Sequence, residues 1–259
     1  LIILFFIPIN IFSQDFIQRL EDSPRHHEWK KLVNNNREEI NTFIVFPEVA
    51  KKVPVIILIH ENRGLNDWAR SMADQIAEMG YIVLAPDLLS GTAPDGGGTT
   101  SFKNSDQART AIYDLSPEKV TSDLDVVFKY GKNIDSANGK VAVIGFCWGG
   151  SQTFKYATNN SSISAAFVCY GTGPKNEIDY KNITAPIYGF YGGNDNRVNA
   201  TIENSVSAMK KAKSFYEPVI YDGAGHGFFR AGENIDASEL NKNARTQGLN
   251  RLKKLLSKL

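Results

Sequence analysis

The feature that most constrains the fold is a repeated alternation of short apolar runs with amphipathic segments. Residues 53–60, VPVIILIH, are apolar and mostly β-branched up to a final polar residue, as in a strand that is buried on both faces of a sheet. In residues 67–79 the apolar side chains are spaced four, four and three positions apart, which places them on one face of a helix. This alternation predicts an α/β fold with a mostly parallel central sheet and helices on both faces.

The same two patterns recur along the rest of the chain. Further strands are predicted near residues 29–32 and 41–46, and at 81–88, 140–146, 165–170, 185–192 and 218–223. Further helices are predicted at residues 105–113, 117–130, 149–158, 201–213 and 236–258. Residues 90–104 are rich in glycine, threonine, serine and proline, a composition that predicts a mobile surface loop. Because the strand–helix pattern resumes after this loop, residues 15–259 are expected to form a single domain.

The N-terminal segment, residues 1–14, reads LIILFFIPINIFSQ. Its apolar stretch is shorter than the ~20 residues of a membrane-spanning helix, but it matches the apolar core of a signal peptide. Because the sequence starts with Leu1 rather than Met, the charged beginning of such a peptide is expected to be missing. We interpret this segment as a signal-peptide remnant and predict a secreted or periplasmic protein with no stable membrane span in its mature chain. A buried N-terminal strand or helix is the alternative.

The charge balance makes two classes of partner unattractive. Lys and Arg number 29, Asp and Glu number 28, and the net charge is +1, so nucleic acids and anionic membranes are poor partners. The sequence carries no recognisable metal-ligand cluster or cofactor motif, so no metal and no cofactor are expected. The expected partner is a small molecule, and the expected assembly is a monomer or a weak oligomer.

The most informative stretch is GFCWGG at residues 145–150, between a predicted strand and a predicted helix. This is the setting of the G-x-S-x-G nucleophile turn, here with Cys147 in place of serine. Such a turn strains the backbone at the nucleophile, and glycine at 145 and 149 removes collisions with neighbouring strands. The beginning of the helix offers its dipole to a thiolate and a backbone N–H to an oxyanion. A phosphate-binding turn, a buried structural cysteine and a disulfide with Cys169 are the alternatives.

Two residues downstream complete a candidate catalytic set. His226 is the only histidine after Cys147 and lies in a glycine-rich stretch past the last predicted strand. Nucleophile turns of this kind are followed along the chain by an acid and then a histidine. Asp195, just past the strand at 185–192, is the candidate acid, whose task is to accept the imidazole N–H and fix its tautomer. His60 is interpreted as a structural polar residue, with shaping of the neighbouring loop as the alternative.

Together these residues closely resemble the dienelactone hydrolase family of the α/β-hydrolase superfamily. The resemblance runs from about residue 29 to the C-terminus. It implies an α/β-hydrolase fold and a Cys-His-Asp triad made of Cys147, His226 and Asp195. The stretches that carry it are HENRGLNDW, YIVLAPDLLSG, GKVAVIGFCWGG, YGGNDNRV and GAGHGFFR.

The resemblance also implies groups around the sulfur. The backbone N–H groups of Asn62 and Trp148 are implied to form the oxyanion hole. Glu61 matches a family glutamate close to the nucleophile, and a carboxylate placed there takes the thiol proton when substrate arrives. An ion pair between Glu61 and its neighbour Arg63 is the alternative.

Family members that act on dienelactones hold the substrate carboxylate with arginines, which suit bidentate binding. Arg230 matches one of these arginines. Arg109 matches the other and shares a helical face with Tyr113; a solvated helix charge is the alternative for Arg109. The implied activity is carboxymethylenebutenolidase-like hydrolysis of esters or lactones through a thioester. The N-terminal segment and the loop at 90–104 differ from compact cytoplasmic members. They leave two alternatives open, a general carboxylesterase and a catalytically silent binding or redox-sensing protein.

Overall fold

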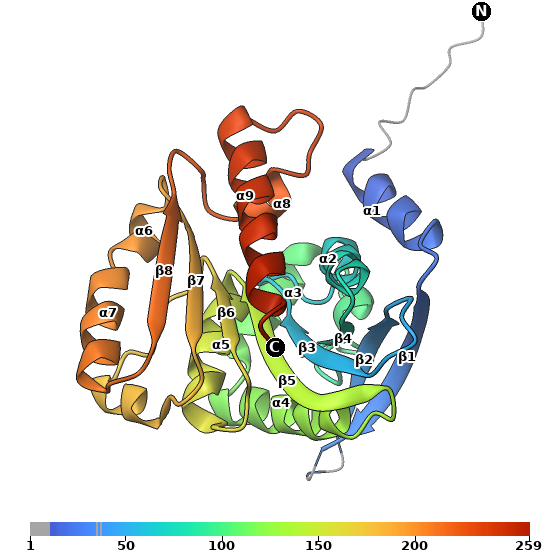
Figure 1. Cartoon of the computed structure of the whole chain (residues 1–259). Helices are drawn as coiled ribbons and strands as arrows, with labels where there is room; N and C mark the ends of the chain where they lie inside the picture. Colours follow the sequence, from blue (N-terminus) through green and yellow to red (C-terminus); the bar gives the residue numbers. More distant parts are fainter. Residues whose placement is uncertain (1–10, 35, 37) are drawn as a thin grey trace, which may run out of the picture.

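A computed structural model describes residues 11–34, 36 and 38–259, and an eight-stranded sheet runs through them (Figure 1). The strands are β1 (His26–Val33), β2 (Glu39–Phe46), β3 (Val53–Ile59), β4 (Ile82–Pro86), β5 (Ala137–Phe146), β6 (Ala166–Cys169), β7 (Ile187–Gly192) and β8 (Tyr216–Tyr221). Their order in the sheet is β1-β2-β4-β3-β5-β6-β7-β8. Strands β3 to β8 pair in parallel, whereas β2 is antiparallel to both β1 and β4. The prediction of a mostly parallel sheet is confirmed.

Helices follow most of the strands, as the alternation predicts. They are α1 (Ile11–Glu21), α2 (Asp67–Glu78), α3 (Ser105–Asp114), α4 (Pro117–Lys132), α5 (Trp148–Asn159), α6 (Asn196–Asn199), α7 (Ile202–Lys211), α8 (Phe228–Ala231) and α9 (Glu239–Leu256). Every predicted strand and helix is present, with its ends shifted by a few residues. The sequence pattern missed α1, α6 and α8. The last two are single turns, which are too short to show a helical period.

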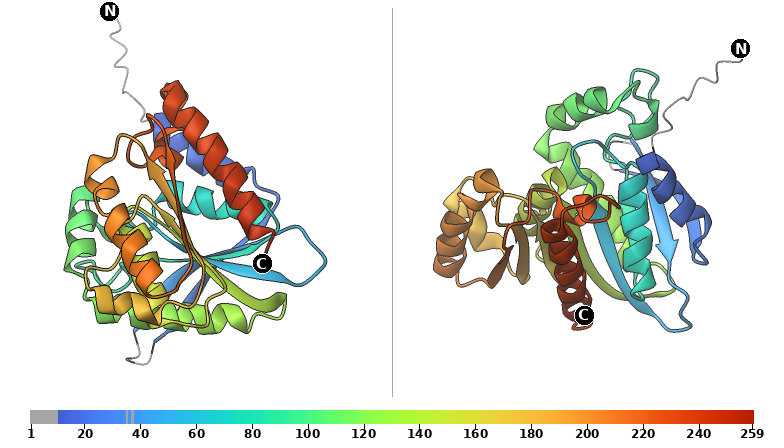
Figure 2. Two further views of the ribbon diagram at one scale, coloured as in Figure 1. Left: turned by 60° about the vertical axis from the view of Figure 1, so that its left-hand side comes forward. Right: turned by 90° about the horizontal axis from the view of Figure 1, so that it is seen from above.

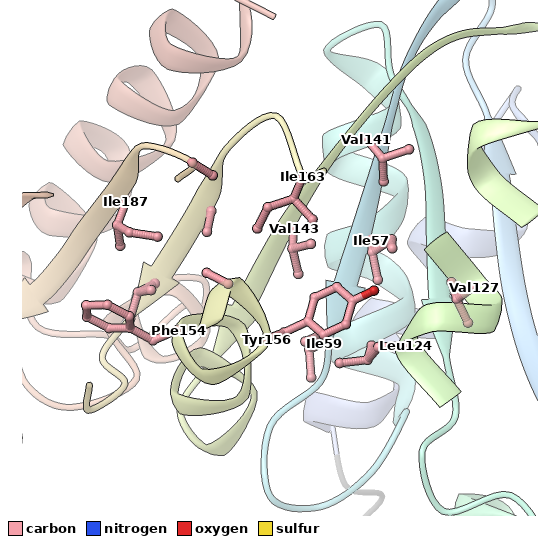
Figure 3. Close-up of a cluster of buried hydrophobic side chains, with 14 of the residues drawn as sticks. Ile57, Ile59, Leu124, Val127, Val141, Val143, Phe154, Tyr156, Ile163 and Ile187 are labelled. Atoms are coloured by element: carbon pink, nitrogen blue, oxygen red, sulfur yellow. The ribbon is translucent and has the colours of Figure 1, made fainter. Parts of the chain in front are cut away.

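Strand β3 contributes to two separate apolar cores. Val55, Ile57 and Ile59 pack in a cluster with side chains of α4 and α5 (Figure 3). Ile56 and Leu58 pack in a second cluster with side chains of α2 and α9. Successive side chains of a strand point to opposite faces, so a continuously apolar run fits a strand covered on both sides. Figure 2 shows the sheet between α9 and α4, which confirms helices on both faces.

The described part of the chain begins with α1. Residues 1–10 of the predicted signal segment lie outside the described residues, and residues 11–14 form the start of this helix. Helix α1 lies against α2 (Figure 1), where Phe16 and Leu20 pack on the second core. Within the described part of the chain, no helix combines the length and apolar character needed to cross a membrane.

The loop at residues 90–104 is anchored near its middle. Asp87, just after β4, accepts hydrogen bonds from the backbone N–H and the hydroxyl of Thr99, both at 2.7 Å. The Thr99 hydroxyl oxygen also accepts the backbone N–H of Leu65 at 2.9 Å. These bonds join the loop to the segments that follow β4 and β3. The loop therefore has anchors beside the sheet at Thr99, and the mobility that its composition predicts stays a prediction.

Candidate active site

The candidate site lies along one edge of the sheet. Parallel strands bring their carboxyl ends to the same edge, which is where open α/β sheets bind ligands. Glu61 and Asn62 follow β3, and Cys147 follows β5. Asp195 follows β7, and His226 follows β8. Residues that are far apart in the sequence are therefore gathered in one place by the parallel order of the strands.

The turn at Cys147 is strained and tightly packed. Cys147 has φ 56° and ψ −115°, a backbone conformation that is costly for any residue with a side chain. A Cβ on Gly145 would lie 2.1 Å from the carbonyl oxygen of Gly149. A Cβ on Gly149 would lie 2.3 Å from the carbonyl oxygens of Ile59 and His60. Both positions therefore require glycine, and the absence of side chains there lets α5 start directly against the end of β3.

His226 lies between the sulfur and the acid. Its Nε2 is 3.1 Å from Cys147 Sγ, and its Nδ1 is 2.5 Å from Asp195 Oδ2. Asp195 is buried, and its other oxygen accepts the backbone N–H of Val198 at 3.3 Å, as the N-cap of α6. A carboxylate held in this way favours a proton on Nδ1 and leaves Nε2 free to accept the thiol proton.

The environment of the sulfur favours the neutral thiol. Burial, and to a smaller extent the nearby Glu61 carboxylate, raise the pKa of Cys147 to about 11. A hydrogen bond from the Trp148 backbone N–H and the charges of Arg197 and Arg230 lower the pKa, but by less. At neutral pH the resting side chain is therefore a thiol. The sequence suggested a thiolate favoured by the helix dipole, and desolvation outweighs that effect. The nucleophile must therefore form by proton transfer to a neighbouring base.

Glu61 pairs with Arg230 rather than with its sequence neighbour Arg63. Its Oε2 accepts Arg230 Nε at 2.8 Å, and its Oε1 accepts the Tyr170 hydroxyl at 3.3 Å. The Glu61 side chain is 9% exposed and that of Arg230 is 46% exposed. This carboxylate raises the pKa of Arg230. The Arg230 side chain is thus half-exposed to solvent, and it lies near enough to Cys147 for its charge to act on the thiol.

The influence of Glu61 on the thiol gives a testable expectation. Glu61→Gln removes a negative charge beside Cys147 and leaves Arg230 uncompensated, so the pKa of the thiol should fall. Each unit of pKa decrease raises the thiolate fraction about tenfold and lowers its nucleophilicity, for a net gain of roughly threefold in alkylation rate. Iodoacetamide labelling of Cys147 at pH 7.5, followed by peptide mass spectrometry, measures this rate. Glu118→Gln, on the exposed start of α4, is the control, and an unchanged or slower rate in Glu61→Gln contradicts the expectation.

The other predicted residues lie on the outer side of the site. Asn62 Nδ2 donates to the Tyr113 hydroxyl at 3.2 Å, which joins α3 to the segment after β3. The Arg109 guanidinium lies 6.0 Å from the centre of the Tyr113 ring. Tyr113 is 58% exposed. The structure therefore brings Tyr113 to Asn62 and leaves Arg109 exposed to solvent beside the Tyr113 ring.

Sequence analysis missed Tyr170 and Arg197. Tyr170 directly follows β6, is fully buried and packs edge-on against the His226 ring at a centroid distance of 5.1 Å. Its position past a strand end was the only available signal.

Cys147 and Cys169 are both free, which argues against the disulfide alternative. Within the described part of the chain, no group of three or more His, Cys, Asp or Glu side chains is placed to hold a metal ion.

A strained cysteine turn between a parallel strand and a helix, with an acid after β7 and a histidine after β8, defines the chain as an α/β-hydrolase. The chain belongs to the dienelactone hydrolase family, whose model matches residues 40–259. This match confirms the resemblance found in the sequence and identifies the chain as a hydrolase that acts on esters or lactones.

Individual relatives agree with this assignment. A protein of Methylorubrum extorquens AM1 is 29% identical over 201 residues, which cover 73% of this chain and 68% of that protein. A protein of Escherichia coli K12 is 30% identical over 187 residues, which cover 68% of each chain. Both carry the provisional name carboxymethylenebutenolidase.

Solved structures share the fold at lower sequence identity. One from Klebsiella pneumoniae, provisionally named a dienelactone hydrolase, has a TM-score of 0.78 and 22% identity, and covers 91% of this chain and 99% of its own. Another, a dienelactone hydrolase-like promiscuous phosphotriesterase from metagenomic libraries, has a TM-score of 0.73 and 20% identity. It covers 90% of this chain and 98% of its own. These likenesses establish the α/β-hydrolase fold.

Proposed function

We propose that the protein cleaves an ester or lactone by acyl transfer through a thioester on Cys147, with His226 and Asp195 as its partners. The observation that carries the proposal is the 3.1 Å contact between Cys147 Sγ and His226 Nε2, with Asp195 Oδ2 2.5 Å from the other ring nitrogen. In this arrangement the imidazole takes the thiol proton and the carboxylate stabilises the imidazolium that forms.

The proposed reaction has two halves. His226 Nε2 takes the thiol proton while the sulfur bonds to the carbonyl carbon, and the backbone N–H groups of Asn62 and Trp148 bind the resulting oxyanion. The carbon–oxygen bond of the ester then breaks, and His226 gives its proton to the leaving alcohol or enol. Water next loses a proton to His226 as it attacks the thioester. The carbon–sulfur bond breaks, the proton returns to the sulfur, and the acid product leaves.

We propose that acidic esters or lactones are the preferred substrates. Arg230 is half-exposed beside the sulfur and holds Glu61 at 2.8 Å. A substrate carboxylate competes with Glu61 for this guanidinium, because both are carboxylates and guanidinium groups bind carboxylates strongly. For such substrates, Glu61 released in this way takes the thiol proton in place of His226, so that acidic substrates activate their own nucleophile.

The acidic preference predicts a selective effect of Arg230→Gln. For an anionic ester, loss of the guanidinium should lower kcat/KM by roughly 10²-fold, the scale for breaking a partly buried charge pair. For a neutral aryl ester of similar reactivity the loss should stay below about tenfold, because no carboxylate is bound. Steady-state kinetics with the two esters measures the ratio. Equal losses on both substrates would favour a general carboxylesterase.

A redox-sensing function is less well supported. Thiol oxidation requires the thiolate, and burial raises the pKa of Cys147 to about 11. The neutral resting thiol fits a nucleophile that is activated only within the substrate complex.

The proposed mechanism is tested by trapping the thioester. p-Nitrophenyl acetate should release nitrophenol in a burst of about one equivalent per chain, and acid quenching should leave one acetyl group on the peptide that contains Cys147. Cys169→Ala is the matched control and should keep the burst, because Cys169 is buried below the turn. An acetyl group on another residue, or no turnover, would refute the mechanism.

A further inference from the structure

His60 lies where the two halves of the proposed oxyanion hole meet. It directly follows β3 and precedes Glu61, and it has no exposed surface. Its ring stacks on the Trp148 indole, with centroids 5.8 Å apart and planes inclined by 15°. One oxyanion donor is the backbone N–H of Asn62, two residues later, and the other belongs to Trp148 itself.

The two ring nitrogens of His60 have partners of opposite polarity. Nε2 lies 3.2 Å from the backbone nitrogen of Leu88, which can only donate, so Nε2 must be the unprotonated acceptor. Nδ1 lies 2.8 Å from the carbonyl oxygen of Glu61, which can only accept, so Nδ1 must carry the proton. The two bonds therefore select one neutral tautomer. Burial lowers the pKa of His60 and outweighs the opposing charges of Asp87 and Glu61.

The bond to Glu61 fixes the peptide that carries the Asn62 N–H. In a trans peptide the C=O and N–H point in opposite directions, and the peptide between Glu61 and Asn62 is trans. The Glu61 oxygen is held by His60 Nδ1 at 2.8 Å and by the Gly64 backbone N–H at 3.4 Å. The opposed Asn62 N–H has no hydrogen-bond acceptor among the described residues. It is therefore available to a ligand.

We propose that His60 is a positioning residue: its Nδ1–H holds the Glu61 carbonyl so that the Asn62 N–H points to the oxyanion formed on Cys147. This inference deepens the proposed acyl-transfer function and rests on it. An oxyanion donor is effective only if it is oriented before the charge develops, since reorientation during the reaction would offset part of the stabilisation. The weaker turn bond from Gly64 leaves His60 as the main restraint on this peptide.

Two amide substitutions separate the two bonds of the ring. The amide nitrogen of asparagine occupies nearly the position of Nδ1, so His60→Asn keeps the donor to Glu61 and loses the acceptor for Leu88. The amide oxygen of glutamine can replace Nε2, so His60→Gln keeps the acceptor for Leu88 and loses the donor to Glu61. Both variants place one amide in the same buried cavity, so each is the matched control for the other.

The measurements compare a reaction that forms an oxyanion with one that does not. Acylation of Cys147 by p-nitrophenyl acetate passes through a tetrahedral oxyanion, whereas alkylation by iodoacetamide displaces iodide at a saturated carbon. In His60→Gln, acylation should slow by about 10²-fold or more, the scale for loss of one oxyanion donor. The substrate concentration that half-saturates the burst rate, which reports substrate binding, and the alkylation rate should each change by less than about threefold in that variant, because substrate binding and the thiol are untouched. His60→Asn should acylate within about tenfold of wild type, because it keeps the donor to Glu61.

Several outcomes would overturn the role of His60. One is an acylation rate in His60→Gln equal to that of the wild type. Another is an equal loss of acylation rate in both variants. A third is an alkylation rate in His60→Gln that falls in parallel with its acylation rate. A wild-type chain that forms no thioester on Cys147 would instead refute the proposed function itself, and the role of His60 with it. Long-range ¹H–¹⁵N NMR of the wild-type chain tests the tautomer even if a variant fails to fold. The neutral Nδ1–H form should persist from about pH 6 to 8, and an Nε2–H form would contradict the inference.

Discussion

Alanine in place of Cys147 is expected to lower kcat/KM for p-nitrophenyl acetate by about 10⁴-fold or more, because the acyl-transfer route loses its nucleophile. The fold should tolerate the change, since alanine adds no atom at the strained turn where φ is 56°. Stopped-flow and steady-state kinetics on the purified variant measure the loss, and thermal unfolding verifies that the variant is folded.

The partnership with His226 makes this prediction more specific. Residues that act as one unit give non-additive losses, so the double variant with His226→Ala should be no slower than Cys147→Ala alone. The 3.1 Å contact between sulfur and ring nitrogen is the physical reason. If the two losses multiply, the residues act independently and the proposed proton transfer is wrong. Substantial activity in Cys147→Ala would exclude the cysteine as nucleophile.

The sequence predicts well which residues the structure brings together in the candidate site, because the relevant signals are local. Cys147, Asp195 and His226 each stand just past an apolar run that predicts a strand, and parallel strands present such positions at a common edge. The glycines at 145 and 149 could likewise be explained from the demands of one turn, and the distances around them agree with that explanation.

The sequence predicts the charge network around the sulfur less well because its contacts are non-local. Glu61 has Arg63 two positions away, yet its partner is Arg230, 169 positions along the chain. Tyr170, which donates to Glu61, lies 109 positions away. The raised pKa of the Cys147 thiol depends on how deeply the sulfur is buried and on this carboxylate. The helix dipole alone reflects neither the burial of the sulfur nor this carboxylate. It favours a thiolate at Cys147, whereas the raised pKa keeps the side chain a neutral thiol.

Gly149→Ala is expected to lower the free energy of unfolding by more than about 3 kcal/mol, beyond the usual cost of overpacking. The added Cβ would lie 2.3 Å from the carbonyl oxygens of Ile59 and His60. Both obstacles are backbone atoms of a buried strand end, so no side-chain rotation relieves the contact and α5 must move away from β3. Urea unfolding followed by circular dichroism measures the loss.

The matched control for this substitution lies in the same site. A Cβ on Gly225 would meet only Asn241 Oδ1, at 3.9 Å, so Gly225→Ala should change stability by less than about 0.5 kcal/mol. Helix α5 starts at Trp148, the residue after Cys147, so a shift of α5 in Gly149→Ala also moves Cys147. The folded fraction of this variant should therefore acylate slowly even under conditions where unfolding is negligible. A Gly149→Ala chain as stable and active as wild type would show that the close approach of α5 to β3 is dispensable for the nucleophile turn.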